Sequence, residues 1–221
     1  PGLDLLGVEV APRPRGLDPA IAWTTALPES VDGLIVANEW LDNIPCHVAE
    51  VDEAGTLRMV HVDPTSGVES WGSALTHGSV PVTLREWVER WWPVDRAQPG
   101  LRVEIGSSRD TAWADVVARL THGMAVAIDY GHVRSDRPAY GSLRSYRHGR
   151  EVDVLPDGSR DLTAHVAVDS VANRVDGRVR TQREVLAELG VSGQRPALAL
   201  ATADPTAYVR RLATATEAAE L

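Results

Sequence analysis

Several short apolar runs in this chain end directly in acidic or amide side chains, and amphipathic segments separate the runs. Leu34–Ala37 leads into Asn38 and Glu39, and Met124–Ile128 leads into Asp129. Short apolar runs of this kind predict buried strands. Buried strands that alternate with helices favour a mostly parallel sheet covered on both faces. The sequence therefore predicts an α/β fold.

Turn and capping signals predict the elements between these strands. Apolar and polar residues alternate from His47 to His61 around a Gly-containing turn, which indicates an antiparallel hairpin. Thr83–Glu86 matches a capping box, and Pro93 should end the helix that follows. The other expected helices run through Trp113 to Gly123, span Gln182–Leu189 before Gly190, and begin at Asp204-Pro205. Glycine and proline at these positions are ordinary helix boundaries.

We expect one domain over residues 1–221, with a hairpin and helical insertion at about 47–106, because no linker-like or repetitive segment divides the chain. The sequence opens with Pro1, followed by the apolar run Leu3–Val10. That run is expected to form a further buried strand.

Composition narrows the classes of partner. Acidic residues outnumber basic ones by 31 to 22, which gives a formal charge of −9 and argues against nucleic acid as the main partner. No apolar run is long enough for a membrane span. A single cysteine, Cys46, can close no internal disulfide, so we expect a reducing compartment, the cytoplasm.

Polar residues at strand ends form the candidate site. In parallel sheets, ligands bind beyond the carboxyl ends of the strands. The residues that close or follow the three expected strands, and that should therefore be neighbours, are Glu9, Asn38, Glu39, Asp42 and Asp129. A crevice with several carboxylates and an amide suits a ligand with hydroxyl groups and positive charge, and it repels phosphates.

Four ordered motifs resemble those of a known family. They are residues 37–45 (ANEWLDNIP), 128–132 (IDYGH), 141–148 (GSLRSYRH) and 161–166 (DLTAHV). Together they are similar to the MidA-like family of class I S-adenosylmethionine-dependent methyltransferases, and the resemblance covers roughly residues 5 to 190. The mitochondrial member of that family, which assists complex I assembly, is a protein arginine methyltransferase. The resemblance implies a Rossmann-like sheet that holds the methyl donor.

The resemblance also implies roles for individual residues. Glu9 would accept hydrogen bonds from the donor's ribose, and Asn38 and Glu39 would line its methionine and sulfonium side. The candidate catalytic residues, which would orient a guanidinium and accept its proton, are Glu39, Asp42 and Asp129. The candidate substrate-binding residues are Trp40, Tyr130 and His165. We expect a protein substrate and no metal, and we leave a homodimer open.

Two other functions stay open, and the first of them follows from one departure from the family. No glycine-rich turn precedes Glu9, so the central first strand of the family fold is expected to be missing from this chain. The chain would then be part of a longer enzyme, or a binding or assembly factor that kept the fold and lost catalysis. The third possibility is a metal-dependent hydrolase, whose scattered candidate ligands would be His132, His148, His165, Asp129 and Asp161. These residues lack the short spacing of common metal motifs.

Overall fold

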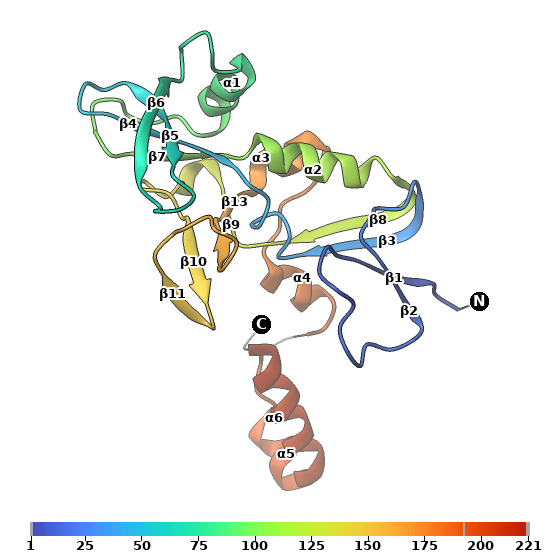
Figure 1. The fold of residues 1–221 in the computed structure, drawn as a ribbon. Coiled ribbons are helices and arrows are strands. Elements are labelled where there is room, and N and C mark those ends of the chain that lie inside the picture. The colour runs from blue at the N-terminus through green and yellow to red at the C-terminus, as the bar shows by residue number, and fades with distance from the viewer. Residues whose placement is uncertain (1, 192, 220–221) are drawn as a thin grey trace. The chain divides into compact units, whose positions relative to one another are not determined.

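The computed structural model describes residues 2–191 and 193–219, which fall into two compact units, Pro1–Gly177 and Arg178–Leu221. The elements of the first unit, in chain order, are β1 (Leu5–Val8), β2 (Ile21–Thr24), β3 (Val31–Asn38), β4 (His47–Val51), β5 (Leu57–Val62), β6 (Glu69–Ala74), α1 (Val82–Trp91), β7 (Arg102–Ile105), α2 (Ser107–Val117), β8 (Leu120–Ile128), β9 (Gly131–His132), the 3-10 helix Arg134–Asp136, β10 (Arg144–Arg147), β11 (Arg150–Val152), β12 (Asp161–Thr163), β13 (Val166–Ala167) and α3 (Val168–Arg174) (Figure 1). The second unit contains α4 (Gln182–Glu188), α5 (Leu198–Ala203) and α6 (Pro205–Ala219).

The expected α/β composition is present, but the strands do not form one mostly parallel sheet. Three parallel pairs occur, β1–β2, β3–β8 and β13–β9. The other sheets are antiparallel, with strand orders β6-β5-β4-β7 and β11-β10-β12. The prediction of a single sheet was therefore wrong. The reason is that the apolar pattern of a segment indicates a strand, whereas pairing between distant segments decides which strands share a sheet.

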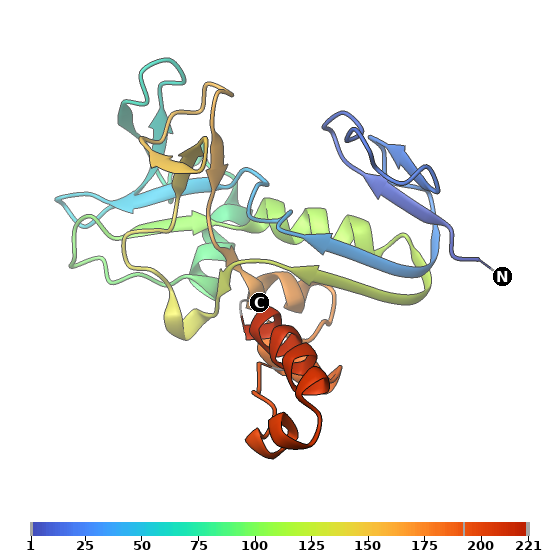
Figure 2. The ribbon, with the colours of Figure 1, turned by 90° about the horizontal axis from the view of Figure 1, so that it is seen from below.

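The β3–β8 pair is covered on one face. Helix α2 lies along both strands in the two views of the ribbon (Figure 2), and Trp113 and Val116 of α2 share a core with Ile35. On the other face Leu34 is 64% exposed and Met124 is 62% exposed. Within the first unit, the prediction of cover on both faces was therefore wrong, because the helix of that unit that contacts this pair, α2, packs on one side only.

The four-stranded antiparallel sheet β6-β5-β4-β7 packs against α1 and forms a second hydrophobic core. The predicted hairpin over residues 47–61 is confirmed as β4 and β5, and Val103 and Ile105 of β7 are fully buried beside them. Helix α1 packs Trp87 on this sheet. The predicted capping box at Thr83 was wrong, because the helix starts at Val82, after Pro81, so Thr83 already lies inside the helix and no side chain caps it.

A second boundary differs at the junction of α2 and β8. The helix ends at Val117 and the strand begins at Leu120, so Gly123 lies inside the strand instead of ending the helix. Gly123 has a φ of +118°, and a Cβ there would lie 1.8 Å from the carbonyl oxygen of Gly33. The glycine thus permits β8 to approach β3 closely.

Two helices of the second unit, α4 and α6, begin where the sequence predicts, whereas α5 had no predicted counterpart. Helix α4 has a capping box in which Thr181 and Glu184 each accept from the other's backbone N–H, and Gly190 follows with a φ of +79°. Asp204 Oδ1 accepts from Ala207 N at 2.9 Å at the start of α6. Across the described residues of both units, no helix combines the length and apolar character needed to cross a membrane.

Candidate functional site

Strands β3 and β8 bring two of the sequence motifs to one edge. The strands run parallel with Asn38 opposite Ile128, and Glu39 N continues the ladder by donating to the carbonyl oxygen of Ile128 at 2.8 Å. Glu39 and Asp129 therefore follow their strands at the same end. This confirms that the acidic residues behind these two strands are neighbours.

Asp129 organises this edge with one carboxylate oxygen. Its Oδ2 accepts from the backbone N of Leu41 at 2.9 Å and of Trp40 at 3.2 Å. Its Oδ1 is buried and has no hydrogen-bond partner among the described residues. Burial, and then the negative charge of Asp42, raise the pKa of Asp129 from 3.8 to about 6. The free oxygen is an acceptor of raised basicity.

Glu39 forms the solvent-facing side of the edge. Its φ of +45° lies in the left-handed region, which side chains other than glycine seldom adopt. Tyr130 Oη donates to Glu39 Oε1 at 3.3 Å, and the charge of Glu39 raises the pKa of the Tyr130 hydroxyl. Both side chains are exposed. The left-handed turn thus places a carboxylate and a phenol together at an accessible position.

Asp42 is close by but is fully engaged within the fold. The residue is 6% exposed, its Oδ2 accepts from Thr163 Oγ1 at 2.7 Å, and its Oδ1 accepts from Asn43 Nδ2 at 3.0 Å. Its charge nevertheless acts on Asp129. The geometry favours a role for Asp42 in setting the pKa of Asp129 over direct contact with a ligand.

Trp40 and His165 both lie close to this edge, Trp40 next to Glu39 in the chain and His165 against Tyr130. Trp40 is half-buried and packs against the core around Leu41, whereas the exposed His165 ring stacks with Tyr130 at a centroid separation of 6.2 Å. His165 N donates to Ser142 Oγ at 2.8 Å, which joins the motif at 161–166 to the motif at 141–148. The three predicted substrate-binding residues therefore flank the acidic residues.

Glu9 lies at the end of another strand pair, β1–β2. It follows β1, its backbone N donates to the carbonyl oxygen of Thr24 at 3.0 Å, and its Oε1 accepts from Ala11 N at 3.1 Å. Within residues 2–191 and 193–219, no hydrogen bond or ion pair joins Glu9 to Asn38 or Asp129. Its role in ribose binding stays a prediction.

Arg109 holds the site together, although no sequence pattern pointed to it. Its side chain is at the start of α2 and is 3% exposed. It donates to the carbonyl oxygens of Asp42 at 2.8 Å, Ile44 at 3.1 Å and His165 at 2.9 Å. These acceptors lie 56 to 67 residues away along the chain. Because every acceptor is a backbone group, local spacing carried no signal.

Glu104 is a second buried residue that the sequence did not reveal. It is 3% exposed, and its carboxylate accepts from Ser142 N at 2.7 Å, Ser142 Oγ at 2.6 Å and Leu143 N at 2.7 Å. Gly141 has a φ of +74° and passes close to this carboxylate. The apolar strand Arg102–Ile105 thus carries one acid that fixes the motif at 141–148.

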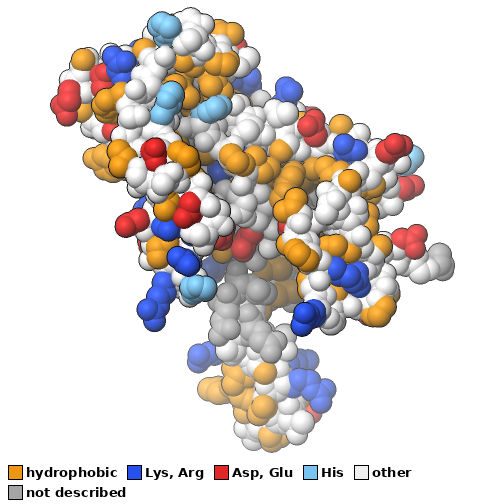
Figure 3. All heavy atoms as spheres, viewed as in Figure 1, with side chains coloured by type: hydrophobic (Ala, Val, Ile, Leu, Met, Phe, Trp, Pro, Cys, Tyr) orange, Lys and Arg blue, Asp and Glu red, His pale blue; other side chains and the backbone are white. Residues whose placement is uncertain are grey.

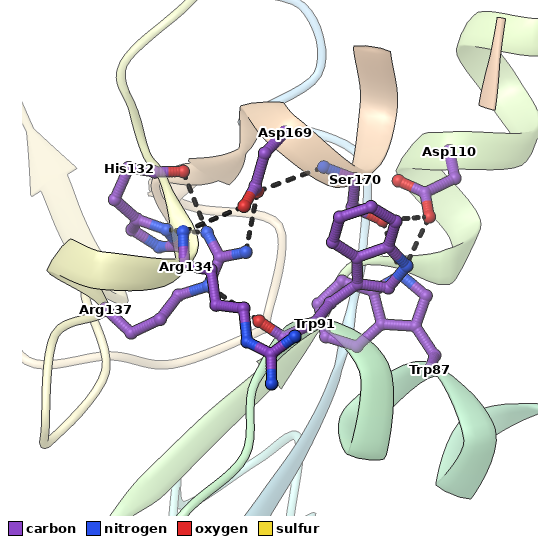
Figure 4. Close-up of polar contacts among 8 residues, drawn as sticks. All are labelled: Trp87, Trp91, Asp110, His132, Arg134, Arg137, Asp169 and Ser170. Atoms are coloured by element: carbon purple, nitrogen blue, oxygen red, sulfur yellow. Dashed lines mark hydrogen bonds and ion pairs between the residues drawn. The ribbon is translucent and has the colours of Figure 1, made fainter. Parts of the chain in front are cut away.

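A buried polar network lies behind the edge and anchors the segment after Tyr130 (Figure 4). Arg137 pairs with Asp169 at 2.6 Å and donates to the Nδ1 atom of His132 at 2.7 Å and to the carbonyl oxygen of Trp91 at 3.1 Å. Burial, and then the charge of Arg137, lower the pKa of His132 to about 4. The imidazole is therefore neutral near pH 7.

A second group of hydrogen-bonded side chains, also drawn in Figure 4, joins α1, α2 and α3. Trp87 Nε1 donates to Asp110 Oδ2 at 2.7 Å, and Ser170 Oγ donates to the same oxygen at 2.5 Å. Burial raises the pKa of Asp110. In the part of the chain that the structure describes, no three His, Cys, Asp or Glu side chains form a group that could hold a metal ion. The scattered ligands of a metal-dependent hydrolase do not come together there.

Comparisons with known proteins relate this chain to a protein family and to two solved structures. Residues 9–185 match the model of a family described as "Putative S-adenosyl-L-methionine-dependent methyltransferase". No curated protein matches the sequence. The fold resembles a Burkholderia thailandensis protein crystallised with S-adenosyl-homocysteine, with a TM-score of 0.61, 24% identity, and coverage of 90% of this chain and 51% of that one.

A native crystal structure from the same organism is similar, with a TM-score of 0.64 and 22% identity over 90% of this chain and 53% of that one. The chain thus spans about half the length of the solved structures that it matches. At these identities the likeness concerns the fold.

Proposed function

The chain belongs to this family of S-adenosyl-L-methionine-dependent methyltransferases, and on that premise we propose that it transfers a methyl group to a protein nitrogen, with an arginine side chain as the acceptor. The four ordered motifs support a MidA-like member of the family. We place this activity in the cytoplasm, and a homodimer remains part of the proposal. The acid-rich edge behind β3 and β8 supports a cationic acceptor.

The residues at this edge fit the methyl donor. When bound, S-adenosyl-L-methionine supplies an electrophilic methyl group on a positively charged sulfonium. Asn38 and Glu39 follow β3 and are exposed, so they are accessible to a ligand with positive charge and hydrogen-bond donors. Glu9 is the proposed acceptor for the ribose hydroxyls.

The side chains of this edge would divide the work on the acceptor. A guanidinium is protonated at neutral pH, so a carboxylate must orient it and take the proton that it loses when the new N–C bond forms. Asp129, with a pKa of about 6, is ionised at pH 7 and is a stronger base than an ordinary aspartate. We assign proton acceptance to Asp129 Oδ1 and orientation of the acceptor to Glu39.

The neighbouring groups would position these two acids. Burial raises the pKa of Asp129 most, and the negative charge of Asp42 raises it further. Tyr130 fixes Glu39 through its hydroxyl, and the stacked rings of Tyr130 and His165 offer a flat surface for a guanidinium. Holding two reactants in line supplies acceleration without a covalent enzyme intermediate.

The observation that carries this proposal is the carboxylate of Asp129. Its Oδ2 accepts from the backbone N–H groups of Trp40 and Leu41, whereas its Oδ1 is buried and has no hydrogen-bond partner among the described residues. Asp129→Asn in the complete protein keeps the shape of the side chain and removes the base. We expect unchanged binding of S-adenosyl-homocysteine by calorimetry and loss of methyl transfer from labelled donor to arginine peptides. The matched control is Asp115→Asn, because Asp115 is an exposed acidic residue on α2.

The outcome separates the proposal from its main alternative. Full turnover in Asp129→Asn would remove Asp129 from the mechanism. Cofactor binding without transfer to any arginine-containing protein, in the wild-type chain as well, would favour a binding or assembly factor with a methyltransferase fold.

A further inference from the structure

The hairpin of β10 and β11 presents an unusual cluster of positive charge. Residues 144–150 read RSYRHGR and contain no acidic side chain, although the chain as a whole has a formal charge of −9. His148 and Gly149 form its two-residue turn, with φ values of +52° and +73°. Two consecutive left-handed residues are typical of a tight type I′ hairpin turn.

The register places two guanidinium groups opposite each other at the end of the hairpin. Arg147 pairs with Arg150 across the strands, and both are exposed. Like charges directly opposite each other destabilise an antiparallel pair. In the described ranges, neither residue forms an ion pair, whereas Arg144 is paired with Glu151 at 3.4 Å. Nothing in the described fold neutralises the Arg147–Arg150 pair.

The one acidic residue of the hairpin strands, Glu151, lies on the other face. Side chains alternate along a strand, so Arg147 and Arg150 share a face with the pair Ser145–Val152, while Tyr146 and Glu151 lie opposite. The space-filling view shows basic side chains gathered over the β10–β11 hairpin (Figure 3). The two arginines are therefore available to an external anion.

The base of the hairpin is fixed, which reduces the entropy lost on binding. Ser145 is fully buried, and β10 also pairs with β12 through Ser145 and Leu162. The segment just before the hairpin is held by Glu104 through Ser142 and Leu143. Such preorganisation favours affinity because fewer torsions must be ordered on binding.

We propose that the tip of the β10–β11 hairpin binds an acidic segment of a partner protein, with Arg147 and Arg150 each donating paired hydrogen bonds to a carboxylate. The planar guanidinium matches carboxylate geometry, and charge-assisted pairs are the stronger hydrogen bonds. A short peptide fits better than a long polyanion, because the basic surface is small and the whole chain is acidic. Neutralising the arginine pair removes its mutual repulsion.

Fluorescence anisotropy with a labelled, glutamate-rich peptide tests this interaction in the full chain. The double substitution Arg147→Gln with Arg150→Gln is expected to weaken binding about tenfold or more. Arg210→Gln with Arg211→Gln, two exposed arginines on α6, changes the net charge equally and should leave affinity within about twofold. A glutamine-rich peptide should not bind.

Three results would overturn the proposal. The first is equal loss of affinity in both double variants, which would show attraction to net charge alone. The second is absence of binding by the wild-type chain to the acidic peptide. The third is equal or tighter binding to a single-stranded oligonucleotide or to anionic lipid vesicles, which would indicate a polyanion or a membrane surface.

A stability measurement separates binding from misfolding. Because the two arginines repel each other without a ligand, the Arg147→Gln, Arg150→Gln variant should melt at the same or a higher temperature than the wild type. Reduced affinity with retained melting temperature supports the proposal. If the variant is unfolded, Arg147→Lys with Arg150→Lys keeps the charge and should still lose affinity severalfold, and unchanged affinity in that variant would contradict the proposal.

Discussion

Replacing Arg109 with methionine should destabilise the fold more than any other arginine substitution at the candidate site. The side chain is 3% exposed and donates three hydrogen bonds to backbone carbonyls. Bonds from a charged donor contribute about 1.5–3 kcal/mol each, and the cost of burying the guanidinium offsets part of their sum. We expect the free energy of unfolding to fall by about 2–4 kcal/mol, a large share of the roughly 5–15 kcal/mol typical of a domain.

Urea unfolding followed by circular dichroism measures this change. Arg119→Met is the control, because Arg119 is half-buried and its side chain donates one hydrogen bond, to the carbonyl oxygen of Pro28 at 2.8 Å. It should cost about 1 kcal/mol. The loop from Glu39 to Ile44 should also become susceptible to protease in Arg109→Met. Equal losses in the two variants would refute the view that Arg109 fastens this loop.

Other predictions concern the charges of the site. Glu39→Gln should abolish methyl transfer in the complete protein and leave the melting temperature unchanged, and unchanged turnover would exclude Glu39 from the mechanism. Asp42→Asn should lower the pKa of Asp129 and shift the acid limb of the pH–rate profile, expected near pH 6, to lower pH; an unshifted limb would contradict the coupling. Because the pKa of Asp129 is raised, its protonated form favours folding, so stability should decline as pH rises from about 4 to about 6, and Asp129→Asn should remove this decline in pH-dependent urea titrations. Burial lowers the pKa of His132, so its contribution to stability should be lost as pH falls from about 6.5 to about 4, and His132→Gln should flatten that dependence in the same assay.

The sequence located the strand ends of the site because the physics there is local. The apolar runs of β3 and β8 each stop at a polar residue, and the parallel pairing of these two strands places those stops at one edge, whereas Glu9 follows β1 in a separate parallel pair. Glu39 and Asp129 could therefore be predicted as neighbours although they lie 90 positions apart in the sequence. The parallel register of β3 and β8, with Asn38 opposite Ile128, bears this out.

The groups that stabilise the site could not be predicted in the same way. Arg109 and Glu104 bind backbone atoms of distant segments, and no pattern of side chains marks such partners. Glycine is ambiguous in sequence, since Gly123 could end a helix or let two strands approach, and its position beside Gly33 decided between these. The start of α1 was likewise ambiguous, since Pro81 stands at the N-cap and the helix begins at Val82, ahead of the predicted capping box.

The division into small sheets was also beyond local inference. Pairing of β4 with β7 joins residues separated by the whole of α1, and such contacts depend on closing long loops. The exposed face around Leu34 shows that an apolar run can form a strand without being covered in the described residues. The positions of β1, β3, β4, β5 and β8 followed from sequence, whereas the other strands, the cover and the strand order did not.

A nuclear magnetic resonance titration of the complete protein with S-adenosyl-homocysteine tests the central claim most directly. If the edge behind β3 and β8 holds the methyl donor, the backbone amide signals of Asn38, Glu39 and Asp129 should shift with saturation, while those of the β10–β11 hairpin should not. Saturable shifts elsewhere, with these three amides unmoved, would contradict the account.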